Sequence, residues 1–330
     1  MRFGLQVIAD IPGEQMLALM REGEELGYDT VWCPDSHLIW REAFAALGAA
    51  TQVTRATALG TAVTNVETRH LTVVASAMAT LQELSGGRMI CGIGLGDSAV
   101  ETLGLHRTRR RDLEEAVGRL RRLWAGEEVE LGDGTGGRLT WCRDVRIPVY
   151  YGASGPRMLD DAGRLADGVI TLVGADPVRV GAALERFRAS ARAAGRDPDD
   201  LEEVVWLACS VADDPHEAVD AVRSHAARAI THALPHPLDE EESRVAEEVR
   251  RTYDYYEHVG DRPAHASAMP EEIVRRFAVA GTPDDCVSQL EALRDVGVRR
   301  VGVLPMGADR SAVSRRFVTE VAARFMDPAA

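Results

Sequence analysis

Short apolar segments alternate with longer amphipathic segments along most of the chain. Eight of the short segments have the length and residue types of strands, and several are apolar at every position, as is typical of parallel strands buried on both faces. We predict strands at Phe3–Ile8, Thr30–Cys33, Ala56–Thr61, Met89–Ile93, Val149–Tyr151, Gly168–Leu172, Val204–Val211 and Arg300–Leu304. Helical periodicity lies between them, at Glu14–Leu26, Leu71–Leu84, Arg111–Trp124, Arg157–Leu165, Pro177–Ala194 and Pro283–Val296. Eight such units predict one α/β domain over residues 1–330, a (β/α)8 TIM barrel.

Two stretches interrupt this alternation. Residues Glu127–Arg146 are rich in glycine and predict a small hairpin. Residues Pro235–Pro270 are polar and predict an insertion of one or two helices, packed by the tyrosines at 253, 255 and 256. The histidines between Pro235 and His265 have no metal-ligand spacing, so we interpret them as surface residues.

Composition excludes several classes of function. The 330 residues include 38 Lys+Arg and 52 Asp+Glu, so the net charge of −14 argues against a nucleic-acid partner. Every basic residue among those 38 is arginine, which excludes Schiff-base lysine chemistry and a P-loop. There is no apolar run of 18 residues, so no membrane span is expected.

The cysteines point to a reducing compartment. Their number is odd, and no two are close enough for a metal knuckle; they are Cys33, Cys91, Cys142, Cys209 and Cys286. The amino terminus enters a strand at once, without a signal peptide. We therefore expect a cytoplasmic protein without disulfides or a bound metal.

In a TIM barrel the chemistry lies in loops that follow the strands. After the fourth strand, Gly92-Ile-Gly-Leu-Gly96-Asp97 resembles a dinucleotide-binding fingerprint, but the next clear helix begins only near Arg111. We interpret these glycines as allowing close approach of a ring or substrate, with Asp97 projecting into the barrel mouth.

The loop after the fifth strand, Gly152-Ala-Ser-Gly155-Pro156, combines small residues with a proline at a helix start. This arrangement favours a phosphate cradle made by backbone N–H groups at Ala153, Ser154 and Gly155. A tight strand-to-helix turn without a ligand is the alternative interpretation.

The loops after the second and third strands carry further polar groups. In Asp35-Ser-His37-Leu-Ile-Trp40, a titratable ring stands near a large aromatic residue, and histidine is the usual proton donor at neutral pH. A structural hydrogen-bonding role for His37 is the alternative. The run from Ala62 to His70 includes Asn65 and Arg69, which could hold an anion or the edge of a flat heterocycle.

Together these segments resemble the bacterial luciferase-like monooxygenase superfamily. The most specific resemblance runs from Thr68-Arg-His70 through Leu81-Gln-Glu-Leu-Ser-Gly-Gly-Arg88 to Gly92–Gly96. Further matches are Gly155–Leu159, Ala166–Ile170 and Gly281–Asp284, so the resemblance spans nearly the whole chain. The sequence is most similar to the deazaflavin branch, which uses coenzyme F420 and includes methylenetetrahydromethanopterin reductase-like oxidoreductases.

The resemblance implies a set of site residues. It places the cofactor, F420 or alternatively FMN, at the carboxyl ends of the strands, with a non-proline cis peptide at Ala62–Val63. The implied cofactor-binding residues are Asp35, Ala62, Val63, Asn65, Gly96, Ala153, Ser154 and Gly155. The implied catalytic residues are His37 or Asp97 for the proton and Trp40 for the pocket wall. In relatives the histidine directly follows the acidic residue, whereas here Ser36 intervenes.

The resemblance also implies a reaction and partners. We expect hydride transfer to or from a C=N, C=C or C=O group of a small-molecule substrate. An FMN-dependent, oxygen-using monooxygenase and a non-catalytic flavin-binding homologue are the alternatives. A homodimer formed through helices of the early units and a separate reductase that supplies reduced cofactor are expected partners. We expect the loop after Cys33 and the Pro235–Pro270 insertion to wall the substrate pocket.

Overall fold

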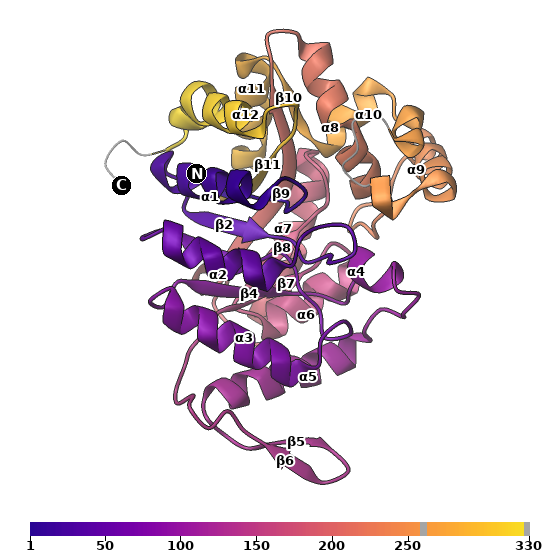
Figure 1. Cartoon of the computed structure of the whole chain (residues 1–330). Helices are drawn as coiled ribbons and strands as arrows, with labels where there is room; N and C mark the ends of the chain where they lie inside the picture. Colours follow the sequence, from indigo (N-terminus) through magenta and orange to yellow (C-terminus); the bar gives the residue numbers. More distant parts are fainter. Residues whose placement is uncertain (258–262, 327–330) are drawn as a thin grey trace.

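Eight parallel strands close into a barrel in the computed structural model, which describes residues 1–257 and 263–326 (Figure 1). The ring runs β1–β2–β3–β4–β7–β8–β9–β11 and returns to β1, with β8 also paired to β9. The bounds are β1 (Arg2–Gln6), β2 (Thr30–Cys33), β3 (Ala58–Thr61), β4 (Met89–Ile93), β7 (Val149–Gly152), β8 (Gly168–Thr171), β9 (Glu202–Val211) and β11 (Arg300–Pro305). The predicted TIM barrel is confirmed.

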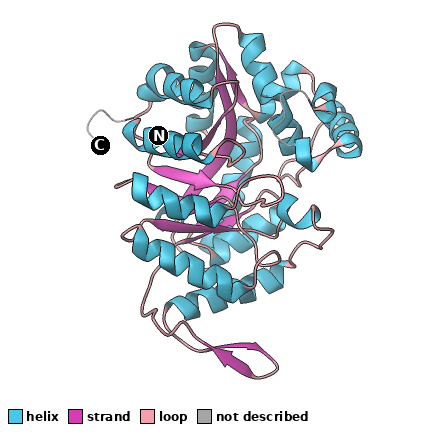
Figure 2. Ribbon diagram, in the orientation of Figure 1, coloured by secondary structure: helices cyan, strands magenta, loops and turns pink. Residues whose placement is uncertain are grey.

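Helices cover the outside of this barrel (Figure 2). These helices include α1 (Gly13–Glu25), α2 (Ala43–Val53), α3 (Leu71–Leu84), α5 (Arg110–Trp124), α6 (Pro156–Leu165), α7 (Pro177–Ala193), α8 (Pro215–Ile230) and α11 (Pro283–Asp295). Several begin with proline in the first turn after a capping side chain: Asp176 caps α7, Asp214 caps α8 and Thr282 caps α11. The proline needs no N–H there, and the cap accepts one of the N–H groups that the first turn leaves unpaired.

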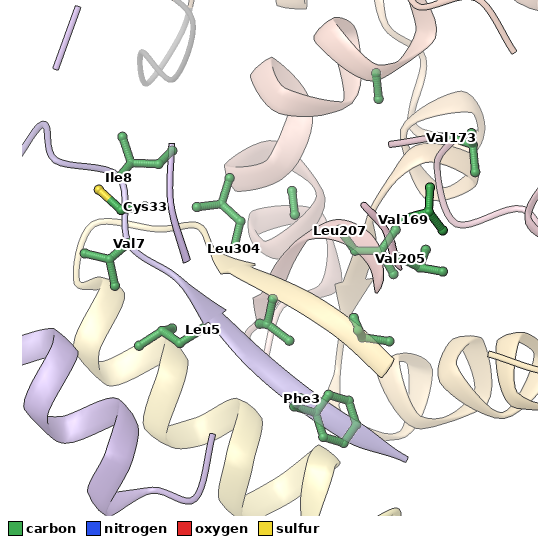
Figure 3. Packing of buried hydrophobic residues seen from close by; sticks show 14 of the residues in the cluster. Phe3, Leu5, Val7, Ile8, Cys33, Val169, Val173, Val205, Leu207 and Leu304 are labelled. Carbon is green, nitrogen blue, oxygen red and sulfur yellow. The ribbon is translucent and has the colours of Figure 1, made fainter. Parts of the chain in front are cut away.

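One hydrophobic core lies between the strands and the helices. On β1 and just beyond it, Phe3, Leu5 and Val7 alternate with residues that face the barrel interior, and all three are buried (Figure 3). This two-residue period is the side-chain period of a strand.

A second, smaller cluster fills the barrel interior. It comprises Trp32, Ala62, Ile90, Tyr150, Ile170, Val204 and Trp206. The Trp32 ring occupies the space left by two glycines, because a Cβ atom at Gly4 would lie 2.6 Å from Trp32 Nε1 and one at Gly60 would lie 2.4 Å from Trp32 Cζ3. The indole therefore fills the barrel interior and leaves the mouth at the carboxyl ends of the strands for a ligand site.

The remaining elements complete the fold. The glycine-rich stretch forms the predicted hairpin, which projects from the barrel (Figure 1). A short strand that we did not predict pairs in parallel with the end of β9 at Cys209–Val211. These elements are β5 (Val129–Gly132), β6 (Thr135–Gly137), β10 (Val279–Gly281), α4 (Ser98–Glu101), α9 (Glu240–Thr252), α10 (Glu271–Phe277), α12 (Arg310–Arg316), a π-helical turn at Phe317–Val321, and 3₁₀ turns at Pro198–Asp200, Tyr255–Glu257, Ala264–Ala268 and Ala322–Arg324.

The insertion corrects one prediction. Helix α9 lies within it as expected, and His236 is exposed. His265, however, is only 1% exposed, because its 3₁₀ turn packs the imidazole against Tyr253, with ring centroids 4.4 Å apart. The interpretation of His265 as a surface residue was therefore wrong. His258 lies outside the described residues.

All five cysteines are buried and free of disulfides, as predicted. Within the described residues, no helix has the length and hydrophobicity needed to cross a membrane. The same residues hold no cluster of three or more side chains suited to a metal ion.

Candidate active site

A cavity of about 330 Å³ opens at the carboxyl ends of the barrel strands. Its floor is made by residues that also belong to the interior cluster, Ala62, Ile170 and Trp206. Its walls come from the loops after β2, β3, β4 and β7 and from the end of α8. The cavity lies where side chains in this fold act on a ligand.

A backbone bulge after β3 forms one wall. The Ala62–Val63 peptide bond is cis, as the resemblance implied, and both residues line the cavity. The bulge is fixed by the next strand, since Thr64 N–H donates to Gly92 O at 2.9 Å. Two glycines give it room: a Cβ atom at Gly94 or at Gly152 would lie 3.0 Å from Val63 Cγ2.

Asp35 stands buried beside this bulge. Its Oδ2 accepts a hydrogen bond from Thr64 Oγ1 at 2.7 Å. The same oxygen forms an ion pair with Arg69, which also pairs with Glu42. Within the described residues Asp35 Oδ1 has no hydrogen-bond partner. A buried charged oxygen without a donor is costly, so this wall is suited to a ligand that brings an N–H or O–H group.

Asn65 shapes the loop that leads from the bulge to α3. Its Oδ1 accepts hydrogen bonds from the N–H groups of Glu67 at 3.0 Å and Thr68 at 2.9 Å. These bonds fix the side chain in the cavity wall and leave its amide Nδ2 group for a ligand.

The predicted cradle lies at the amino end of α6. Ala153, Ser154 and Gly155 all line the cavity, and the helix begins at Pro156. Gly155 is the N-cap and offers no side-chain acceptor, so the helix end keeps donor capacity for an anion. Ser154 Oγ points instead toward the end of β8, where it accepts a hydrogen bond from Leu172 N–H at 3.2 Å.

Asp97 is held by two arginines in the wall. Its Oδ2 pairs with Arg228 of α8, and its Oδ1 pairs with Arg107 Nη2 at 2.7 Å. Arg107 Nε also donates to Glu101 Oε1 at 2.5 Å. Tyr255 donates its hydroxyl hydrogen to Glu101 and lies 3.4 Å from Asp97 Oδ1.

Arg228 is buried and fixed from several sides. Besides Asp97, its Nη1 donates to Thr231 Oγ1 at 2.7 Å. Its guanidinium carbon lies 5.3 Å from the ring centroid of Tyr253 and 5.6 Å from that of Tyr255. The insertion thus packs against the charge network at the barrel mouth.

The environment sets the protonation of the wall. Burial alone would raise the pKa of Asp97, but Arg228, His232 and Arg107 outweigh it and lower the pKa to about 2. Burial, with Arg228 nearby, lowers the pKa of His225 to about 4 and that of His232 to about 3. At neutral pH the wall therefore holds an ionised carboxylate and two uncharged imidazoles.

All of the site residues predicted from the sequence line this cavity except His37. His37 is not part of the wall, and its Nδ1 is buried without a hydrogen-bond partner in the described part of the chain. Ser36 lines the wall where His37 was expected, and its Oγ lies 2.5 Å from Ser98 Oγ. Trp40 does line the cavity, as expected.

The expected substrate wall needs a correction. None of the described residues of the Pro235–Pro270 insertion lines the cavity; that side is formed by α8 and the residues after it. The sequence analysis did not single out His225, Arg228 and His232, which line it there. Their spacing, three and then four residues apart, is that of one helical face and is the available signal, although α8 ends at Ile230 and His232 lies just beyond it.

The comparisons with known proteins agree with this geometry. The sequence profile of the luciferase-like monooxygenase family matches residues 1–300. The chain is 30% identical over 322 residues to the 5,10-methylenetetrahydromethanopterin reductase of Archaeoglobus fulgidus, covering 94% of this chain and 95% of that protein. It is also 30% identical over 331 residues to the F420-dependent glucose-6-phosphate dehydrogenase of Nakamurella multipartita, covering 94% and 92%.

A solved structure has the same fold over nearly the whole length. The coenzyme F420-dependent tetrahydromethanopterin reductase from Methanopyrus kandleri superposes with a TM-score of 0.82 at 25% identity. The match covers 98% of this chain and 99% of that one.

Proposed function

Because this chain belongs to the luciferase-like monooxygenase family, we propose that it is an oxidoreductase that transfers a hydride between coenzyme F420 and a small organic substrate. The two relatives that are 30% identical to it over more than nine-tenths of its length are named as a 5,10-methylenetetrahydromethanopterin reductase and an F420-dependent glucose-6-phosphate dehydrogenase. The reacting group of the substrate is a C=O, C=N or C=C bond, or its reduced form.

The observation that carries the proposal is the Asp35 carboxylate beside the Ala62–Val63 bulge. Asp35 is ion-paired on one oxygen and lacks a hydrogen-bond partner on the other within the described residues. A deazaflavin ring carries N–H and O–H groups that match such an acceptor. The flat backbone of the bulge and the Asn65 amide lie in the same wall, so the residues present fit the ring of F420.

The remaining contacts fit the rest of the cofactor. Ser154 and Gly155 at the amino end of α6 would hold the phosphodiester, because they present N–H donors at the positive end of a helix dipole. The N–H group of Ala153, predicted as a third donor, is already used, since it donates to Ile170 O at 2.9 Å. Bound there, F420 would supply or accept a hydride at its central ring carbon.

The chain itself orients the substrate and excludes water. Trp40, Ile170 and Trp206 provide apolar surface around the reacting centre. The uncharged imidazoles of His225 and His232 each carry one donor and one acceptor nitrogen, which suits them to orient a carbonyl or hydroxyl group. Asp97 is ionised, so at neutral pH we assign it to holding charge and not to donating a proton.

A second copy of the chain is the partner we propose in addition. Helix α2 contains no charged residue and α3 contains one, Glu83, although 27% of the whole chain is charged. On α3, Val73 is 54% and Leu84 is 53% exposed. Exposed apolar side chains on a helix with few charges are typical of an interface, and α2 and α3 belong to the early units of the barrel.

Anaerobic turnover tests the proposed reaction. Reduced F420 is mixed with the protein and a panel of small ketones, imines and enones in the absence of oxygen, and oxidation of the cofactor is followed by absorbance. We expect substrate-dependent oxidation without oxygen, and none when reduced FMN replaces F420. Turnover that requires oxygen and FMN would instead identify a monooxygenase.

A further inference from the structure

The charged side chains around Asp97 bear on which substrates the cavity can bind. We propose that the cavity selects uncharged substrates, because Asp97 together with Glu101 neutralises the two arginines in its wall, and that Asp97, which contacts both arginines, is thereby a specificity-determining residue. This inference rests on the proposed function, since it concerns the substrate of the same cavity.

Each charged side chain among the described residues of the wall has an opposite charge as its partner. Asp35 is paired with Arg69, which lies behind the wall. Arg107 and Arg228 both contact Asp97. Two carboxylates thus serve the two arginines, because Arg107 also pairs with Glu101 at 2.5 Å.

Arg228 is not available to a ligand while these contacts hold. One end of its guanidinium is bound to Asp97 and Thr231. The rings of Tyr253 and Tyr255 lie beside it, as described above. An anionic substrate would have to displace a carboxylate that is already charge-paired, and it would lose its own hydration in doing so.

The other titratable groups do not supply a positive charge. His225 and His232 are uncharged at neutral pH, since burial lowers the pKa of both. The chain contains no lysine. A phosphate or carboxylate group on the substrate therefore meets an electrically balanced wall, whereas an alcohol, ketone or imine meets apolar surface and neutral hydrogen-bonding groups.

The size of the cavity points to a small molecule. At about 330 Å³ it is at the low end of the range for ligand pockets. The cofactor ring would take part of that space. The substrate class that fits is a small, uncharged alcohol or carbonyl compound, or the corresponding imine, in contrast to the sugar phosphate for which one group of relatives is named.

The test is to remove the neutralising carboxylate and look for a gain of anion binding. Asp97→Asn keeps the size of the side chain but leaves Arg228 and Arg107 short of one negative charge. The probes are inorganic phosphate and glucose 6-phosphate, measured by calorimetric titration and by the shift in melting temperature. We expect the dissociation constant for phosphate to be at least about ten-fold lower in the variant than in the unmodified protein, since charge-assisted hydrogen bonds to arginine become available.

Two further variants serve as controls. Asp199→Asn makes the same chemical change in an exposed ion pair with Arg299, 3.1 Å apart and outside the cavity wall, and should gain no phosphate binding. The double variant Asp97→Asn/Arg107→Gln should lose much of the gain. If Asp97→Asn fails to fold, Glu101→Gln, which removes one of the two carboxylates paired with Arg107 and leaves Arg228 paired, should show a smaller gain of the same kind.

The outcomes separate this inference from the proposed function. F420 binding by the unmodified protein, measured in parallel, tests the function. If F420 binds but Asp97→Asn gains no phosphate affinity, or if the unmodified protein reduces or oxidises a phosphorylated substrate as well as its uncharged counterpart, the inference is overturned while the function stands.

Discussion

The carboxylate of Asp97 and the guanidinium of Arg228 form an ion pair, although the two residues are 131 positions apart in the sequence. The pair joins the loop after β4 to helix α8 across the mouth of the barrel. It fixes the protonation of the wall, because Arg228 keeps Asp97 ionised and helps to keep His225 and His232 uncharged.

The buried imidazole of His225 predicts a loss of stability in mild acid. Its pKa is lowered from 6.5 to about 4 in the folded protein, so the unfolded chain binds a proton more readily than the folded one. The stability that this histidine contributes is therefore full above pH 6.5 and is lost as the pH falls from 6.5 toward 4. The corresponding loss for Asp97 comes lower, between 3.8 and about 2.

We expect His225→Gln to weaken this dependence. The fall in melting temperature between pH 7 and pH 5 should be smaller in the variant than in the unmodified protein. His236→Gln changes an exposed histidine and should leave the fall as it was. An equal fall in all three proteins would mean that His225 takes up its proton as easily folded as unfolded.

Asp35→Asn should weaken cofactor binding. The substitution removes the charge that pairs with Arg69 and halves the acceptor capacity beside the bulge. We expect the dissociation constant for F420 to rise about ten-fold, as for the loss of one charge-assisted hydrogen bond. The matched variant is Glu42→Gln, which alters the other, more exposed partner of Arg69. Similar losses in both variants would assign the effect to Arg69 and not to Asp35.

Two glycine-to-alanine substitutions should act in opposite directions. A Cβ atom at Gly92 would lie 2.0 Å from the carbonyl oxygen of Thr61, so Gly92→Ala must push β3 and β4 apart. We expect a loss of about 3 kcal/mol or more in unfolding free energy. Gly118 lies in α5 with no atom near the position of the added methyl group, and Gly118→Ala should stabilise by about 0.5–1 kcal/mol. Urea unfolding of both variants checks this, and a stable Gly92→Ala protein would contradict the strand packing.

The scarcity of charge on α2 and α3, with Val73 and Leu84 exposed, predicts a dimer that an introduced charge can break. The unmodified protein should have the mass of two chains in light scattering, and Val73→Arg or Leu84→Arg should convert it to single chains. Val178→Arg alters an isolated residue on α7 that is 63% exposed and should leave the mass unchanged. A single-chain mass for the unmodified protein would refute the interface.

The barrel and most of the cavity wall could be predicted from the sequence. Buried parallel strands read as continuous apolar runs, and the rule that side chains act from the loops after the strands put Asp35, Asn65, Asp97 and Ser154 together before any geometry was known. Each of these residues lies within a few positions of a strand end, where small errors in the strand boundaries do not matter.

His37 shows where this reasoning failed to resolve single residues. The chain turns at Ser36, whose carbonyl oxygen accepts from the N–H groups of Ile39 and Trp40. That turn keeps Ser36 and Trp40 in the wall and leaves His37 out of it. A shift of one residue in a loop has no signature in hydrophobic periodicity.

Arg228 and His232 could not be reached from the strand ends. They line the cavity from the last turns of α8 and the loop beyond it, so no motif beside a strand points to them. The three-residue strand β10 was missed for a related reason: at Val279–Gly281 it is too short to show a period. In both cases the position of the residues depends on contacts between segments that are far apart in the sequence.

Whether this barrel binds F420 for hydride transfer is tested most directly by a paired cofactor titration. Tryptophan fluorescence of the purified protein is followed while F420 and FMN are added in separate experiments, because Trp40 and Trp206 line the cavity and should report on a bound ring. We expect saturable quenching by F420 at micromolar concentrations and much weaker binding of FMN. Tight binding of FMN with weak binding of F420 would contradict it.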